Sequence, residues 1–271
     1  MKQGSLYEAL FQIGALIFVV IVVNATYVTL IRPNADLIQE QQQLLQQQDE
    51  NFVPERSVFI ILRDFEQETC IILMLWAIAI ISMKTQHTLR ERALLDRTLI
   101  QLQDGVSILP EDSRNYSRPV QALSSKEREF LLPRALLAGL HRFQSTENIQ
   151  AVSSIVKDTC ETEADRMETE LTIVRYIAWA IPSIGFLGTV RGIGTALGQA
   201  YQAVSGDIVG VTQSLGVAFN STFVALVVSI LLMFLLHQLQ LLQDRLVLDC
   251  QNYCDARLIR HMQVPEKNEK S

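Results

Sequence analysis

Two hydroxyl-bearing residues, Thr189 and Thr222, lie inside long apolar stretches where polar side chains are rare. Thr189 belongs to "IPSIGFLGTVRGIGT", and Thr222 belongs to "AFNSTFVALVVSI". A threonine in a buried helix can bond the carbonyl four residues before it, or it can line a path for an ion. Asn220 and Ser221 add two more polar side chains next to Thr222. We name these four residues as candidates for an ion pathway.

Small residues occupy one face of the first of these stretches. Gly185, Gly188 and Gly192 follow at i, i+3 and i+7, and in lipid such a stripe lets two helix backbones approach each other. Pro182 removes one intrahelical hydrogen bond and introduces a bend. We assign these four residues to a hinge and to helix packing. A span that is only tightly packed would carry the same stripe, so both interpretations stay open.

Arg191 is the one charged residue in the middle of the same stretch. An arginine at this depth is costly unless it meets water or an acid. Its partner could be a carboxylate of another chain, or Asp207 if the helix end unwinds. The alternative is that Arg191 snorkels to the surface or lies at a subunit seam. The apolar cores of the expected spans contain no Asp or Glu, so a carboxylate for a proton relay is expected from another chain.

Other chemistry has little support in the sequence. The net charge of −6 argues against a nucleic-acid binder, which would present a basic face. We find no phosphate-binding loop, no nucleophile–base arrangement and no cluster of metal ligands, so we expect no catalytic residue, no metal and no cofactor. Each of the four cysteines is expected to be a free, buried thiol: Cys70, Cys160, Cys250 and Cys254.

Apolar helices must hold these residues in place. Hydrophobic residues make up 49% of the 271-residue chain and charged residues only 19%, which is typical of a protein with membrane spans. The first apolar run is too long for a signal peptide, so we expect a retained anchor. Nine segments are predicted: a cytoplasmic N-terminus (1–9), a transmembrane helix (10–31), a periplasmic loop (32–66), a transmembrane helix (67–84), a cytoplasmic helical domain (85–171), a long transmembrane helix with the pore motif (172–204), a periplasmic turn (205–210), a transmembrane helix (211–237) and a cytoplasmic helical tail (238–271).

The orientation follows from the lysines and arginines, which favour the cytoplasmic side. Residues 84–172 contain twelve of the chain's twenty-three, and the turn "SGDIVG" contains none. Both termini are therefore expected in the cytoplasm. The glutamine-rich stretch "QEQQQLLQQQDE" is interpreted as solvated helix or coil, without a function.

The segments assigned to the cytoplasm have the pattern of helices. Ser124 and Glu127 have the spacing of a capping box at a helix start, and apolar residues keep a helical period from about Thr146 into the third span. The tail continues the fourth span with a stripe of apolar residues: Leu235, Leu239, Leu242, Leu246 and Tyr253. We expect these two helical extensions to pair.

The string "GFLGTVRGI", followed by a short turn and "LGVAFNSTFVALVVSI", resembles the MotA/TolQ/ExbB proton-channel family over about residues 172–240. The resemblance implies that Thr189 and Thr222 are the two pore-facing threonines and that Pro182 is the proline of the corresponding helix. The residues of the motif are more similar to those of TolQ and ExbB, whereas four spans in this order are typical of MotA. Arg191 replaces the tryptophan usual in ExbB and TolQ.

The resemblance also implies a fold and partners. It implies an all-α integral membrane protein that forms a homo-oligomer, a pentamer, in the bacterial inner membrane. Five copies would surround two single-span partner helices of the MotB/TolR/ExbD type, each with a membrane aspartate, and this subunit would bind no nucleic acid.

The principal hypothesis is therefore the ion-conducting subunit, for protons or sodium, of a membrane motor that converts ion-motive force into rotation or force. The alternative is a structural oligomeric membrane scaffold that conducts no ions. A secondary transporter is disfavoured because no internal inverted repeat is evident, and an enzyme is disfavoured because no catalytic arrangement exists.

Overall fold

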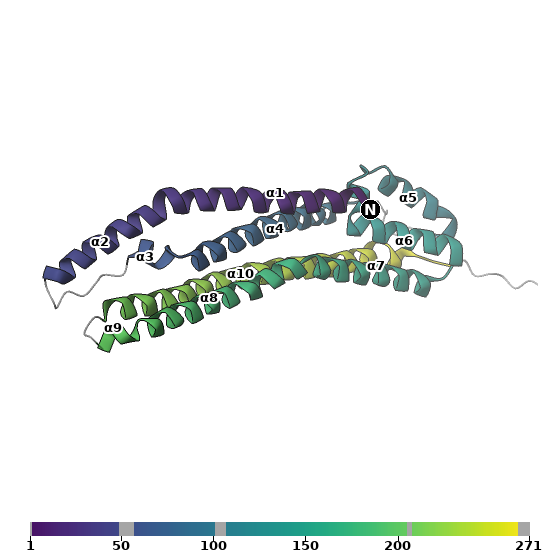
Figure 1. Ribbon diagram of the computed structural model, residues 1–271. Coiled ribbons are helices and arrows are strands. Elements are labelled where there is room, and N and C mark those ends of the chain that lie inside the picture. The colour runs from purple at the N-terminus through teal and green to yellow at the C-terminus, as the bar shows by residue number, and fades with distance from the viewer. Residues whose placement is uncertain (1, 49–56, 101–106, 205–207, 265–271) are drawn as a thin grey trace, which may run out of the picture. The chain divides into compact units, whose positions relative to one another are not determined.

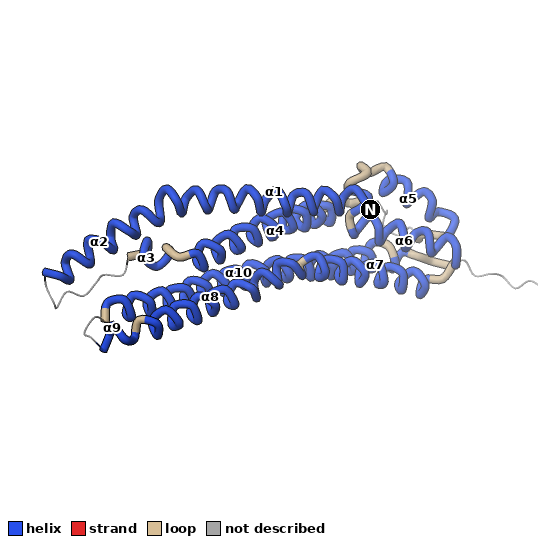
Figure 2. Tube along the Cα trace, in the orientation of Figure 1, coloured by secondary structure: helices blue, strands red, loops and turns tan. Residues whose placement is uncertain are grey.

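The computed structural model describes residues 2–48, 57–100, 107–204 and 208–264. Helices form nearly all of this part of the chain, and Figure 2 shows no strand in it. The α-helices are α1 (Lys2–Thr26), α2 (Arg32–Gln48), α3 (Val58–Leu62), α4 (Phe65–Leu95), α5 (Ser113–Gln121), α6 (Leu131–Thr146), α7 (Ile149–Glu170), α8 (Thr172–Gly198), α9 (Ala200–Val204) and α10 (Val209–Arg257). The shorter turns are η1 (Tyr27–Ile31), η2 (Pro110–Asp112), η3 (Glu127–Glu129) and η4 (Ile259–His261). This confirms the all-α class for the described residues.

Four helical stretches are long and apolar enough to cross a membrane, as expected. They are Leu6–Gln42, Phe65–Leu95, Ile149–Gly198 and Val209–His261. Each stretch is longer than the ~20 residues that a bilayer requires. The predicted spans are therefore parts of longer helices.

The chain divides into two compact units. The first contains Met1–Ser82 and Ile173–Leu236, and the second contains Met83–Thr172 and His237–Ser271. All of the candidate pathway residues belong to the first unit.

In the first unit, the segment after the first predicted span is helical where a loop was expected. A five-residue π-helix, η1, joins α1 to α2, and Figure 1 shows α2 following α1 along the chain. Gln and Leu dominate α2 and are good helix formers. The Arg63 guanidinium, next to α4, pairs with Asp36 of α2 at 2.8 Å and donates a hydrogen bond to Gln39.

The first unit also contains α8 and the first half of α10, which run side by side (Figure 1). The helix expected over 172–204 is interrupted, because α8 ends at Gly198 and α9 is a separate short helix. Glycine is a poor helix former. The Gln199 N–H is shared between the carbonyls of Thr195 and Ala196, both at 3.2 Å, a pattern common at helix ends.

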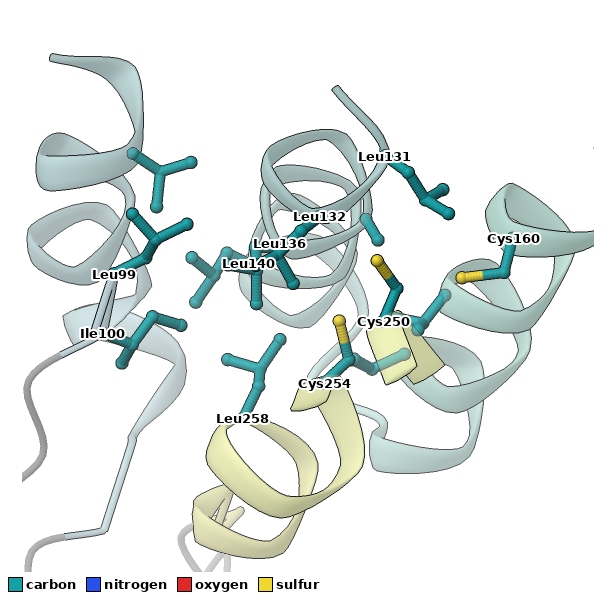
Figure 3. Close-up of a cluster of buried hydrophobic side chains, with 14 of the residues drawn as sticks. Leu99, Ile100, Leu131, Leu132, Leu136, Leu140, Cys160, Cys250, Cys254 and Leu258 are labelled. Carbon is teal, nitrogen blue, oxygen red and sulfur yellow. The ribbon is translucent and has the colours of Figure 1, made fainter. Parts of the chain in front are cut away.

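The core of the second unit brings together α5, α6, α7 and the end of α10. Its apolar side chains come from all four helices, and three cysteine thiols lie among them (Figure 3): Cys160, Cys250 and Cys254. These three and Cys70 are free and buried, as expected. Both α7 and the end of α10, which include the two predicted extensions, contribute side chains to this core.

The apolar stripe predicted along the end of α10 is only partly correct. Leu239 and Leu246 are buried. The other three residues are exposed or half-buried: Leu235, Leu242 and Tyr253. Gln243 and Cys250 are buried instead. They follow Leu239 and Leu246 by one helical turn, so they share the buried face of α10.

The predicted capping box is present, although the helix that it precedes starts later. The Ser124 hydroxyl accepts a hydrogen bond from the Glu127 N–H at 3.3 Å, and the Glu127 carboxylate accepts one from the Ser124 N–H at 3.3 Å. The Ser124 hydroxyl also donates to the Glu127 carboxylate. This hydrogen bond and the one from the Ser124 N–H hold the pKa of Glu127 below its usual value. The following helix, α6, begins at Leu131, whose N–H donates to the buried carboxylate of Glu91 at 3.1 Å.

Candidate functional site

The α8–α10 seam is closed by small residues on both helices. Each of the three striped glycines faces α10 so closely that an added Cβ would clash: Gly185 against Cβ of Ala225 at 2.4 Å, Gly188 against Cβ of Ser221 at 2.5 Å and Gly192 against Cβ of Ala218 at 2.7 Å. Real Cβ atoms do not approach other atoms this closely, so only glycine allows this separation of the backbones. The sequence therefore fixes how deeply α8 sits on α10.

Thr189 and Thr222 meet across this seam. Their two hydroxyl groups share a hydrogen bond. The Thr189 hydroxyl also reaches its own i−4 carbonyl, that of Gly185, at 3.3 Å and the Ala218 carbonyl of α10 at 3.1 Å. The Thr222 hydroxyl reaches the same Gly185 carbonyl at 3.2 Å. Both threonines are half-buried, so they form one polar group between two apolar helices.

Ser221 and Asn220 have different surroundings. The buried Ser221 hydroxyl donates to the carbonyl of Val217 at 2.9 Å and accepts a hydrogen bond from Nε2 of Gln67 in α4 at 3.4 Å. Asn220 is half-buried on α10, and its side chain makes no hydrogen bond to another residue in the described part of the chain. Ser221 therefore joins the seam to α4, whereas Asn220 lies outside this group.

Pro182 lies inside α8 and leaves the carbonyl of Ala178 without its usual intrahelical donor. The hydroxyl of Ser229 in α10 donates to that carbonyl at 3.1 Å. Ser229 was not among the predicted site residues. The sequence around Ser229 gives little indication of this role, because the role depends on Pro182 in a different helix.

Arg191 pairs with acids of its own chain. Its Nε lies 2.7 Å from Oε1 of Glu66, and its Nη2 donates to Oε2 of the same carboxylate at 2.8 Å. Oδ1 of Asp64 lies 4.0 Å from Nη2. Asp207, one of the partners considered from the sequence, lies outside the described residues. In the described residues, the acidic partners of Arg191 are therefore Glu66 in the first turn of α4 and Asp64 directly before α4.

The first turn of α4 carries three buried polar residues: Glu66, Gln67 and Glu68. The Glu68 carboxylate accepts hydrogen bonds from the Asn24 amide at 3.0 Å and from Arg32 at 2.6 Å. Sequence analysis missed this turn because Glu66 was assigned to a loop and the span was started at 67. The available signal was a pair of acids directly before an apolar run, since acids favour the first turn of a helix.

The start of α4 lies deep along α8. Cγ of Glu66 is 3.2 Å from the position of an added Cβ at Gly188, and Gly188 precedes the end of α8 by ten residues, about 15 Å of helix. The charges of α4 therefore lie at nearly the same level as Thr189 and Thr222. In the described residues, no group of three or more His, Cys, Asp or Glu side chains could hold a metal ion.

Comparison with known proteins gives one match. Residues 127–252 match the family model described as the MotA/TolQ/ExbB proton channel family. This range is wider than the 172–240 on which the resemblance rested, and it includes Thr189, Arg191 and Thr222 but not the acids of α4. Neither a search of the curated proteins nor a search of the solved structures finds a match. Residues 127–252, just under half of the chain, are therefore similar to the MotA/TolQ/ExbB proton channel family.

Proposed function

We propose that this chain is the ion-conducting subunit of a membrane motor of the MotA/TolQ/ExbB type. The observation that carries the proposal is the pair of threonine hydroxyls between α8 and α10, inside the family-matched segment. The ion is a proton or a sodium ion. Five copies surround a single-span MotB/TolR/ExbD-like partner in the bacterial inner membrane, with both termini of this chain in the cytoplasm.

The mechanism depends on an aspartate supplied by the partner. A neutral carboxyl tolerates an apolar wall, whereas a carboxylate needs polar contact. The hydroxyls of Thr189 and Thr222 offer that contact at one place on each subunit. Protonation and deprotonation of the partner aspartate would move it from one subunit to the next. The membrane potential supplies about 2.3 kcal/mol per charge for each 100 mV.

The test is removal of both hydroxyls at constant shape. We expect the Thr189→Val/Thr222→Val variant to lose partner-dependent proton or sodium flux, measured with an ion-sensitive dye in proteoliposomes of the co-purified complex. The Thr189→Ser/Thr222→Ser variant retains both hydroxyls and should retain flux. Thr195→Val is the matched control, because the exposed Thr195 bonds only its own helix, at the Arg191 carbonyl (3.0 Å). Normal flux in the double valine variant would overturn the proposal.

A structural scaffold is the second candidate, and one observation favours it. Both threonine hydroxyls already bond backbone carbonyls of Gly185 and Ala218, as they would in a seam that only packs. Mass spectrometry of the detergent-extracted complex separates the two. A single-span partner with a membrane aspartate supports the motor subunit, and oligomers without such a partner support the scaffold.

A further inference from the structure

The charges around Arg191 do not balance. One guanidinium faces two carboxylates, those of Glu66 and Asp64. Glu66 holds Arg191 through both of its oxygens, at 2.7 and 2.8 Å, whereas Asp64 reaches it only at 4.0 Å. Arg191 is therefore neutralised by Glu66, and the negative charge of Asp64 is left over.

Asp64 is the acid of this cluster that is best placed to take up a proton. Its side chain is only 22% exposed, and burial of the carboxylate raises the pKa of Asp64 above its usual value, although Arg191 opposes the shift. Charged and titratable groups from several segments surround Asp64. They are Arg191 of α8, Glu66 of α4, Arg63 directly before Asp64, Arg32 of α2 and Tyr27 of η1. From α10, the neighbouring polar group at this level is the hydroxyl of Ser221.

A second feature of the same turn indicates that a proton donor is missing. Oε1 of Gln67 is buried and has no hydrogen-bond partner among the described residues, while its Nε2 donates to Ser221. An unpaired buried acceptor is costly, and such groups normally bind a donor or an ordered water. An ordered water or another protonated group within hydrogen-bond distance would supply that donor.

We propose that Asp64, directly before α4, is a proton-binding residue in the ion pathway of this chain, and that the Glu66–Arg191 ion pair positions it. The carboxylate of Asp64 gains one proton from the aqueous side and returns it toward the level of Thr189 and Thr222. A metal cation does not suit the cluster, because Arg191 occupies both oxygens of Glu66 and its positive charge repels a second cation. The pathway role rests on the proposed function, whereas proton binding itself does not.

Infrared titration of the purified chain tests proton binding without the partner. We expect a protonated-carboxyl band that titrates at higher pH than an ordinary aspartate and that is absent in Asp64→Asn. Asp255→Asn is the control, because Asp255 is an exposed acid that pairs with Arg260 in the second unit and is not among the groups around Asp64. Absence of this band from the wild type, or its persistence in Asp64→Asn, would overturn the proposal.

Neutralising the two positioning residues should move the midpoint of the band in opposite directions. Glu66 raises and Arg191 lowers the pKa of Asp64. Glu66→Gln should therefore lower the midpoint, and Arg191→Gln should raise it. If Glu66 and Arg191 only hold the helices together, both substitutions would move the midpoint of the band in the same direction. That result would contradict the proposal. If one variant fails to fold, Glu66→Gln/Arg191→Gln removes both charges together and should keep the band.

Proton flux in proteoliposomes of the complex then separates the pathway role of Asp64 from the proposed function of the chain. The expected result is that Asp64→Asn loses the acid limb of the pH–flux profile, while Asp64→Glu keeps it. Normal flux with an unchanged profile in Asp64→Asn overturns the pathway role of Asp64 alone. A wild-type complex that moves no ion overturns the proposed function instead.

Discussion

At the scale of single residues, a proline in α8 is compensated by a serine in α10. Pro182 cannot donate to the Ala178 carbonyl, and Ser229 does so at 3.1 Å. In lipid, no water is available to replace a missing donor. This pair therefore allows the bend expected from Pro182 without leaving a backbone group unsatisfied.

Replacing Ser229 should weaken the first unit measurably. We expect Ser229→Ala to lower the free energy of unfolding in detergent by about 0.6 kcal/mol or more, as is typical of interhelical hydrogen bonds in membranes. Thermal or denaturant unfolding measures this. Ser183→Ala is the control, because Ser183 bonds only its own helix, at the Trp179 carbonyl. In a Pro182→Ala background the cost should shrink, and an unchanged cost there would contradict the assignment.

At the scale of elements, the contact of α8 with α10 depends on the absence of a side chain at Gly185. A methyl group there would lie 2.4 Å from Cβ of Ala225. In contrast, a Cβ at Gly194 or Gly198 would meet nothing within 4 Å among the described residues. Substitution of glycine by alanine should therefore lower the stability of the protein at Gly185 but not at Gly194 or Gly198.

Alanine at Gly185 should destabilise the helix pair by about 1–3 kcal/mol, since overpacking forces the backbones apart. Gly194→Ala should be neutral or stabilising, because alanine is the better helix former by about 1 kcal/mol. Unfolding of the detergent-solubilised protein measures both. Ala225→Gly should rescue Gly185→Ala by making room for the new methyl group. Equal effects at Gly185 and Gly194 would mean that the seam is not closely packed.

The sequence predicts the helices with an apolar or small-residue pattern well and their ends poorly. The four long apolar stretches and the glycine stripe are evident from composition and spacing. The length of α2 and the start of α4 are not, because tertiary contacts such as Arg63 with Asp36 decide where these helices extend. Glu66 was missed for this reason: its role depends on Arg191, which lies 125 positions away in the chain.

At the scale of the whole molecule, the family-matched range and the site acids do not coincide. Residues 127–252 include α8 and most of α10 with both threonines. The charge partners of Arg191 come from Asp64 and α4, outside that range. The residues that pair with Arg191 therefore lie outside the segment that matches the family model.

We propose that the Thr189–Thr222 pair of each subunit faces a partner helix on a shared axis. A single-particle structure of the detergent-extracted complex would decide this. We expect a ring of this chain around the single-span partner, with both threonine hydroxyls turned toward the partner's membrane aspartate. A ring without a central helix, or threonines that face the lipid, would refute the proposal.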